Sequence, residues 1–473
     1  MGGGGVRPGE KPEPGVSPGR RAGRLLAATV VAGAPLCPAP TAAAVTPPPL
    51  DSSRLPPAGP AAPPRPTERY DDCVAVPGQN SISGPATSEP GQLTGVDLPT
   101  VWALTRGAGQ TVAVIDTGVA RHRRLPHLVP GGDYVSTEDG AADCDGHGTI
   151  VAGIIGAAPD SADAAADSGT FTGIAPDVTI LAIRQSSNRF RAIDEPSGSG
   201  FGDVETLAAA VRTAADMGAT VINISSVACL PADADFDDRA LGASLEYAVD
   251  VKNVVVVTAA GNVGGHGQCP AHNPPDRTGW NEVTVVVSPA WYDDYVLTVA
   301  SVGPDGGGST FSLAGPWVDI AAPGEGVVSL APAAEGLVAS GTDDAALSGT
   351  SYATAAVSAI AALVRARHPE MTARQAMRRI EETAHHPAGG WDAAVGSGVV
   401  DVLAAVSDPE ATGIRPPFAP PVDPAVAEAE SEQPPARAAF RGAVVCIALT
   451  AGIVVVSAAA RRLRRSDETV PDR

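Results

Sequence analysis

Three short motifs place a carboxylate, an imidazole and a hydroxyl in one order along this chain. They are Asp116-Thr-Gly, Gly-His147-Gly-Thr and Gly-Thr-Ser351. A serine hydroxyl becomes a strong nucleophile only when a neighbouring imidazole takes its proton, and the imidazole needs a carboxylate to fix its tautomer. We therefore predict that Ser351 is a nucleophile, that His147 is its general base and that Asp116 orients the imidazole.

Each motif also has an ordinary structural interpretation when it is taken alone. An aspartate at a strand end caps turns, Asp-Thr-Gly occurs in aspartic proteases, and a serine after glycine often begins a helix. The order Asp, His, Ser differs from the orders found in chymotrypsin and in the α/β-hydrolases. The three motifs together therefore indicate a serine peptidase.

Such an enzyme also needs hydrogen-bond donors for an oxyanion. Ser351 lies at the predicted start of a helix, where backbone N–H groups favour negative charge. Asn262 follows an aliphatic run through Ala259-Ala260-Gly261. Its side-chain amide is predicted to donate the second hydrogen bond to the oxyanion, whereas the alternative is an ordinary turn residue.

The elements that must position these residues alternate between short aliphatic runs and longer amphipathic segments. Another helix is expected from Thr372, where Thr372 and Gln375 form a capping box. The alternation is typical of an α/β fold with a mostly parallel central sheet and helices on both faces. The predicted strands are 111–115, 178–183, 220–224 and 254–257, and the predicted helices are 204–217, 239–250 and 354–367.

Composition is consistent with a large soluble domain. The chain has 473 residues, of which 44% are hydrophobic and only 4% aromatic, so its core must consist mainly of Ala, Val, Ile and Leu. The formal net charge of -21 argues against nucleic acid as a partner.

Both ends of the chain carry segments typical of membrane targeting. Arginines precede an apolar stretch and Ala42-Ala43-Ala44 follows it, so residues 1–44 are predicted to be a signal peptide rather than a disordered leader. Residues 442–460 are uncharged and mostly apolar, close to the length that spans a bilayer, and are predicted to be a transmembrane helix rather than a buried core helix.

The segments between these ends follow from composition. Residues 45–92 are a Pro-rich N-terminal extension, 93–408 the peptidase domain and 409–438 a Pro-rich linker. Arginines begin the tail, 461–473, and the positive-inside rule places this tail in the cytoplasm. The peptidase domain then lies on the extracytoplasmic side of the cell membrane, held by a single span.

Four of the six cysteines lie in the exported part, where an oxidising compartment favours disulfides. Four cysteines allow three pairings. We favour Cys73 with Cys144 and Cys229 with Cys269, because each pair then joins a loop to its neighbour near the motifs.

Two weaker patterns suggest metal ligands but have better explanations. His266, Cys269 and His272 have the spacing of zinc ligands, yet a disulfide-bonded loop explains them better. The acidic residues between Asp233 and Asp238 lack the glycine and the glutamate of an EF-hand, so a solvated acidic loop is expected. We predict no metal and no cofactor.

Taken together, the motifs resemble those of the subtilisin-like serine proteases over roughly residues 98–407. Within that group the chain is similar to the mycosins, membrane-anchored peptidases associated with type VII secretion. The shared features are the entry from Trp102 to Gly118, Ile222-Asn-Ile-Ser225 followed by Cys229, a cysteine ahead of the domain, the Pro-rich linker and the single C-terminal span.

The resemblance implies a subtilisin-like three-layer fold, with Asp116, His147 and Ser351 as catalytic triad and Asn262 as oxyanion donor. It also supports the Cys73–Cys144 pairing, because mycosins similarly join an upstream cysteine to one just before the catalytic histidine. Small residues would permit backbone pairing with an extended peptide in the substrate groove. The groove residues so implied are Ser225, Ser226, Ala259, Ala260 and Gly261.

We therefore expect a membrane-anchored serine endopeptidase that hydrolyses peptide bonds of exported proteins and associates with a type VII secretion membrane complex. One alternative is a structural subunit that stabilises the secretion complex independently of proteolysis, and another is a nutrient-scavenging subtilase. If Cys73 is bonded to Cys144, one backbone cut does not release residues 45–92, so we expect them to wrap and brace the domain permanently.

Overall fold

The computed structural model describes the chain from residue 45 to residue 408, with gaps. The described ranges are 45–74, 81–82, 90–160, 171–264, 269–274, 279–332, 335–341 and 345–408. The predicted signal peptide, linker, transmembrane helix and tail lie outside them. Within these ranges no helix is both long enough and apolar enough to cross a membrane.

A seven-stranded sheet forms the centre of the domain, and all its neighbouring strands are parallel. The four strands predicted from the sequence are all present, as β3, β5, β7 and β9. In spatial order the strands are β12 (Ile320–Pro323), β11 (Leu297–Val302), β9 (Val255–Ala259), β7 (Val221–Ile224), β3 (Thr111–Asp116), β5 (Thr179–Arg184) and β4 (Leu128–Asp133).

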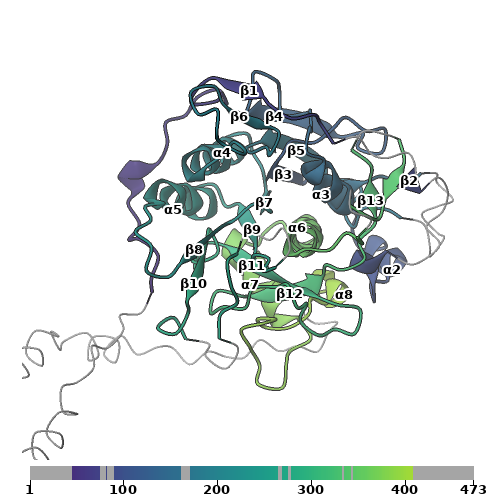
Figure 1. Ribbon diagram of the computed structural model, residues 1–473. Coiled ribbons are helices and arrows are strands. Elements are labelled where there is room, and N and C mark those ends of the chain that lie inside the picture. The colour runs from purple at the N-terminus through teal and green to yellow at the C-terminus, as the bar shows by residue number, and fades with distance from the viewer. Residues whose placement is uncertain are drawn as a thin grey trace, which may run out of the picture. The chain divides into compact units, whose positions relative to one another are not determined.

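Helices cover both faces of this sheet (Figure 1). Helices α3 (His147–Gly156) and α6 (Thr350–Arg367) pack together on one face, and α4 (Val204–Asp216) and α5 (Arg239–Glu246) pack together on the other. A π-helical turn, Tyr247–Val251, continues α5. The result is the three-layer α/β arrangement that the alternating pattern predicts.

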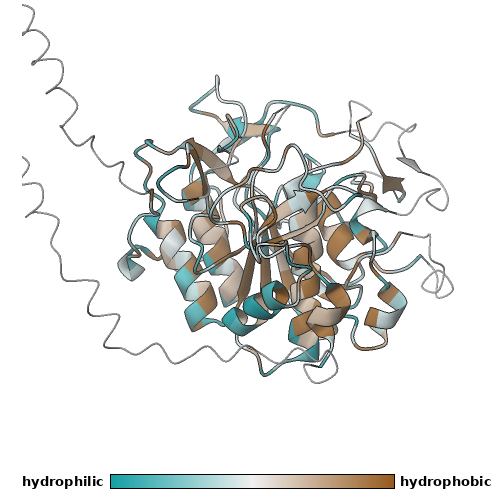
Figure 2. Cartoon of the chain, turned by 90° about the horizontal axis from the view of Figure 1, so that it is seen from below, coloured by the Kyte–Doolittle hydropathy of each residue, from teal (hydrophilic) through white to brown (hydrophobic). Residues whose placement is uncertain are grey.

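The burial of the central strands on both faces explains why their sequences are continuously apolar. In Figure 2 the central strands are hydrophobic, while the surrounding helices turn hydrophilic residues outwards. A parallel sheet covered on both faces needs continuous apolar runs rather than alternation, and every residue of β7 and β9 is buried.

Three further α-helices lie within the described residues. Helix α7 (Ala373–Glu382) begins with the predicted capping box between Thr372 and Gln375. The other two are α2 (Leu98–Trp102) and α8 (Val402–Val406). Helix α6 begins at Thr350, four residues before the predicted Ala-rich segment 354–367 and in agreement with the helix start predicted at Ser351, and Gly349 is its N-cap.

Three small antiparallel sheets surround the central one. One pairs β8 (Ala228–Pro231) with β10 (Val285–Ser288), and another pairs β1 (Thr67–Arg69) with β6 (Phe190–Ala192). The third contains β13 (Ser329–Leu330), β14 (Leu337–Val338) and β2 (Ser81–Ile82). Two of these sheets use residues of the N-terminal extension.

The described parts of the extension, 45–74, 81–82 and 90–92, lie along the surface of the domain rather than apart from it (Figure 1). Its first described residue donates a backbone hydrogen bond from Val45 to the Trp280 carbonyl (3.0 Å). Farther along, Ser52 Oγ donates to Glu246 at the end of α5 (2.8 Å), and β1 pairs with β6. Extension and peptidase domain therefore belong to one compact unit.

Both favoured disulfide pairings are present. Cys73 is bonded to Cys144, which anchors the extension to the loop before α3. Cys229 is bonded to Cys269, which joins β8 to the segment after β9. The extension is therefore held by a covalent bond as well as by hydrogen bonds.

We expect the extension to remain attached after its backbone is cut. A protease that cuts between residues 75 and 89 should leave one species on a non-reducing gel and release the N-terminal fragment only after reduction. The bond closes a loop across 71 residues, so its removal should destabilise the fold by about 4 kcal/mol. The measurements are mass analysis with and without reductant, and thermal unfolding of Cys73→Ser.

A second variant tests whether the Cys73–Cys144 bond is what retains the cut extension. The Cys229→Ser variant should retain the cut fragment under non-reducing conditions, because its Cys73–Cys144 bond is intact. Release of the fragment from the wild-type protein without reductant would contradict the prediction.

Candidate active site

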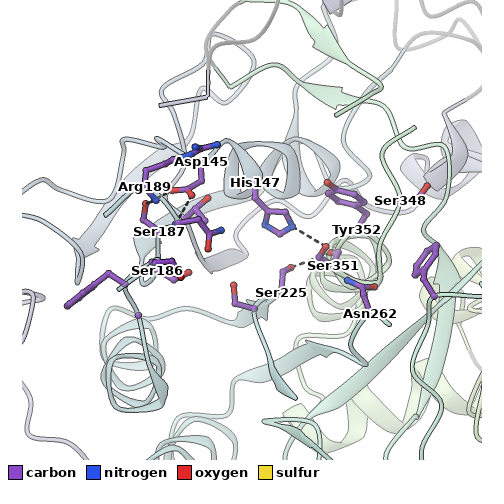
Figure 3. A pocket seen from close by; sticks show the side chains of 18 of the residues that line it. Asp145, His147, Ser186, Ser187, Arg189, Ser225, Asn262, Ser348, Ser351 and Tyr352 are labelled. Atoms are coloured by element: carbon purple, nitrogen blue, oxygen red, sulfur yellow. Dashed lines mark hydrogen bonds between the residues drawn. The ribbon is translucent and has the colours of Figure 1, made fainter. Parts of the chain in front are cut away.

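Three side chains from three separate elements form one hydrogen-bonded chain, and Figure 3 shows the part of it between His147 and Ser351. Asp116 ends β3, His147 begins α3 and Ser351 lies in the first turn of α6. Asp116 Oδ1 lies 2.8 Å from His147 Nδ1, and His147 Nε2 lies 3.0 Å from Ser351 Oγ. This geometry lets the imidazole exchange a proton with the serine while a buried carboxylate holds its other nitrogen.

The partner of Asp116 also decides between two peptidase classes. Aspartic proteases place two carboxylates together so that they share a proton, whereas Asp116 Oδ1 contacts the imidazole of His147 and the backbone N–H of Thr117 (2.7 Å). An Asp-Ser-Gly sequence at 167–169 lies outside the described residues. Asp116 is completely buried, so bulk water does not reach its carboxylate.

Glycines on both sides of His147 permit the close approach of α3 to β3. Gly146 has φ of 87°, in the left-handed region that glycine favours. A Cβ on Gly148 would lie 2.1 Å from the Gly118 carbonyl oxygen. The predicted role of these glycines is therefore steric, since they bring the imidazole next to the strand end that carries Asp116.

Asn262 lies beside the serine with its amide nitrogen turned towards it (Figure 3). Its Oδ1 accepts hydrogen bonds from Thr350 N and Thr350 Oγ1, both at 3.0 Å, which leaves Nδ2 on the side of Ser351. A Cβ on Gly349 would approach both Ser351 Oγ (3.3 Å) and Asn262 Nδ2 (3.7 Å). Glycine at 349 therefore keeps open the space between nucleophile and amide.

A pocket of about 790 Å³ opens over these groups. Ser225 and Ser226 line it as predicted, and the Oγ of Ser225 donates to the backbone carbonyl of Ser351 (3.3 Å). Ala259, Ala260 and Gly261 are not among the residues that line this pocket; Ala259 and Ala260 are buried, and a Cβ on Gly261 would meet the sulfurs of Cys229 and Cys269. A substrate contact by these three residues stays a prediction.

Several residues of the site belong to no sequence motif and were not predicted. The loops 186–189 and 199–202 contribute much of the pocket lining, and Tyr352 places its ring 5.7 Å from the His147 ring. The first of these loops follows β5, so the general tendency of ligands to gather at strand ends points to it. Asp143 and Asp145 lie close to His147 in sequence, and this proximity is the only signal for them.

The acidic segment 233–238 differs from its prediction at one residue. Asp238 is buried, and its carboxylate accepts from Ser288 Oγ (2.5 Å), Trp291 Nε1 (2.8 Å) and Tyr292 Oη (2.7 Å). It is therefore a structural anchor for the β10 region and not part of a solvated loop. Cys269 is used in a disulfide, and His266 lies outside the described residues.

The pH dependence of activity should follow the ionisation of His147. Burial lowers the pKa of His147, but the charges of Asp116, Asp143 and Asp145 and the hydrogen bond to Asp116 outweigh it and raise this pKa above the ordinary 6.5. A general base must be neutral, so kcat/KM should fall as the pH drops through the raised pKa. The midpoint of this acid limb, measured with an uncharged peptide substrate, is expected above pH 6.5, and a midpoint below 6.5 would contradict the geometry.

One hydrogen-bonded chain joins a buried aspartate at the end of a parallel strand to a histidine and a serine, each at the start of a helix. This arrangement defines a serine peptidase with an α/β fold. Residues 107–398 match the model of the subtilase family. The chain therefore belongs to the subtilases, and its similarities place it among the mycosins of that family.

Two curated relatives cover almost the whole chain. Mycosin-4 of Mycobacterium tuberculosis is 54% identical over 93% of this chain and 96% of its own length. Mycosin-3 of the same organism is 41% identical over 95% of this chain and 100% of its own length.

Solved structures agree with this assignment. The crystal structure of MycP1 from Mycobacterium smegmatis has a TM-score of 0.68 and 40% identity, and covers 77% of this chain and 95% of that one. A chain of an intact ESX-5 inner membrane complex has a TM-score of 0.70 and is 40% identical. The match covers 88% of this chain and 100% of that one. The chain is a subtilisin-like serine endopeptidase.

Proposed function

We propose that this endopeptidase cuts exported proteins at a type VII secretion membrane complex, using Asp116, His147 and Ser351 as its catalytic triad. The observation that carries the proposal is the continuous hydrogen-bonded path from Asp116 Oδ1 through His147 to Ser351 Oγ. The open pocket above Ser351 leaves room for an extended peptide.

In this mechanism Ser351 Oγ attacks the carbonyl carbon of the scissile bond while His147 Nε2 takes the hydroxyl proton. Asp116 holds Nδ1 and stabilises the imidazolium that forms. Asn262 Nδ2 and the backbone N–H of Ser351 donate to the oxyanion, because both lie on the side of the nucleophile where that charge develops. His147 then returns the proton to the leaving amine, and water hydrolyses the acyl-enzyme by the same steps.

The site of action is inferred from relatives and from the ends of the chain. Similar proteins occur in the ESX-5 inner membrane complex and in the ESX-1 type VII secretion system. The signal peptide predicted at 1–44, the span predicted at 442–460 and the arginines after it support export of the peptidase domain and its retention at the membrane. Tethering restricts the substrates to proteins that pass this surface.

A structural role in the secretion complex is compatible with proteolysis. The presence of a similar chain in an assembled membrane complex favours it as a second function. The complete triad geometry, however, is what an active peptidase requires and what a purely structural subunit does not need.

The experiment that separates these functions replaces the chromosomal gene with a Ser351→Ala version in the producing cell. Processing of exported proteins should stop while secretion continues, and deletion of the whole gene should also impair secretion if the body of the protein supports the complex. Continued processing in the Ser351→Ala strain would overturn the proposed peptidase function.

A further inference from the structure

A second carboxylate lies next to the catalytic histidine but does not touch the reacting groups. Asp143 precedes His147 by four residues and accepts five hydrogen bonds. Its Oδ1 accepts from Thr117 Oγ1 (2.9 Å), Asp145 N (3.2 Å) and Gly146 N (2.7 Å). Its Oδ2 accepts from the backbone N–H (2.9 Å) and the Oγ1 (2.6 Å) of Thr149. One side chain therefore satisfies three backbone N–H groups around the start of α3.

The two threonines extend this contact to both sides of the active site. Thr117 Oγ1 donates to Asp143 and accepts from the backbone N–H of Gly148 (3.0 Å). Thr149 Oγ1 donates to Asp143 and accepts from the backbone N–H of Ala120 (2.9 Å). The loop 117–120, which leaves β3 after Asp116, is thus joined at two points to the first turn of α3.

These joined segments carry the two partners of one critical hydrogen bond. Asp116 immediately precedes the loop 117–120, and His147 begins α3, so the 2.8 Å contact between them depends on how the segments are held. Gly146 and Gly148 flank His147 and give the backbone little stiffness of its own. The hydrogen bonds of Asp143 therefore add a restraint on the position of the imidazole beyond its place at the start of α3.

We propose that Asp143 is a positioning residue, which clamps the loop after Asp116 against the first turn of α3 and so holds His147 in line between Asp116 and Ser351. This inference rests on the proposed roles of those three residues. The disulfide from Cys144 to Cys73 fixes the neighbouring residue, so the N-terminal extension braces the same clamp.

The pKa of His147 supplies a second measurable effect of Asp143. The negatively charged groups that raise the pKa of His147 are Asp116, Asp143 and Asp145. Burial raises the pKa of Asp143 to about 6, and its hydrogen bonds oppose this shift. Above that pH Asp143 is an anion, so its loss should lower the pKa of His147 as well as loosen its position.

The test compares Asp143→Asn with the wild-type ectodomain, at concentrations fixed by active-site titration. An amide cannot accept from all five donors, because one side of it carries N–H groups. We expect kcat to fall about 100-fold, the loss that a displacement of about 1 Å can cause. KM should change less than twofold, and the acid limb of kcat/KM should move to lower pH.

Matched variants keep the test decisive if Asp143→Asn does not fold. Thr149→Val removes the hydroxyl that joins Asp143 to Ala120 and should lower kcat, whereas Thr149→Ser keeps the hydroxyl and should restore it. Asp177→Asn removes an exposed carboxylate that pairs with Arg106 and should leave activity unchanged.

Two results would overturn the inference. One is a folded Asp143→Asn variant with wild-type kcat and wild-type acid limb, and the other is equal activity of Thr149→Val and Thr149→Ser. If the triad itself is wrongly assigned, Asp116→Asn will also retain activity, so the two failures are distinguishable.

Discussion

Replacement of Ser351 by alanine is expected to reduce kcat by about 10⁶-fold, the loss measured for the corresponding serine in subtilisin. The change removes the oxygen that lies 3.0 Å from His147 Nε2. Because the bond to the imidazole is the one hydrogen bond that Ser351 Oγ makes among the described residues, the free energy of unfolding should change by less than about 1 kcal/mol. The measurements are steady-state kinetics on a peptide substrate and thermal unfolding.

The same variant should also escape covalent labelling. A phosphonate probe reacts with an activated serine, so it should label the wild-type ectodomain and leave Ser351→Ala unlabelled. Ser407→Ala at the end of α8 is a suitable control, since Ser407 Oγ contacts only the backbone of its own helix (2.7 Å) and should not affect labelling. Labelling of Ser351→Ala, or full activity of that variant, would show that the nucleophile lies elsewhere.

Replacement of Asp116 by asparagine is expected to reduce kcat by about 10⁴-fold. The amide has nearly the same shape, so β3 and its buried end should be preserved. Its N–H groups, however, favour the tautomer of His147 that carries the proton on Nε2, and this tautomer cannot accept the proton of Ser351. Kinetics above pH 8 should show the loss in kcat rather than in KM.

The acid limb of the pH profile of kcat/KM gives a separate test of the role of Asp116. Asp116 contributes both a charge and a hydrogen bond that raise the pKa of His147, so Asp116→Asn should move the limb to lower pH. The exposed Asp177→Asn variant should show neither effect. A fall in activity that disappears after correction for the folded fraction would mean that Asp116 supports the fold and not the chemistry.

The sequence predicted the residues of the reaction better than it predicted the other residues that surround the active site. Asp116, His147 and Ser351 lie in short motifs whose residue types the proposed reaction requires, and the three motifs had to be taken together because each has an ordinary structural interpretation alone. The strands could be predicted because a sheet covered on both faces needs uninterrupted apolar runs. The Ala-rich run 354–367 did not by itself show the first turn of α6, since glycine, threonine and serine there carry little helix signal of their own.

The groove residues show what residue type leaves open. Ala259, Ala260 and Gly261 are small, which is compatible with a groove, and their contact with a substrate stays a prediction. Asp238 appeared as one of several acidic residues, and only the buried hydroxyl and indole groups around it show that it is an anchor. Residue type alone does not report which side chains from distant segments surround a position.

The amino-acid sequence by itself therefore predicted the reaction class, the parallel α/β fold and the candidates for nucleophile, base and orienting carboxylate. Tertiary structure alone decided the orientation of the Asn262 amide, the path of the N-terminal extension and the clamp that Asp143 forms between β3 and α3. The physical reason is that motifs record what a reaction requires of single side chains. Distances and hydrogen-bond directions, in contrast, arise only when segments far apart in sequence pack against one another.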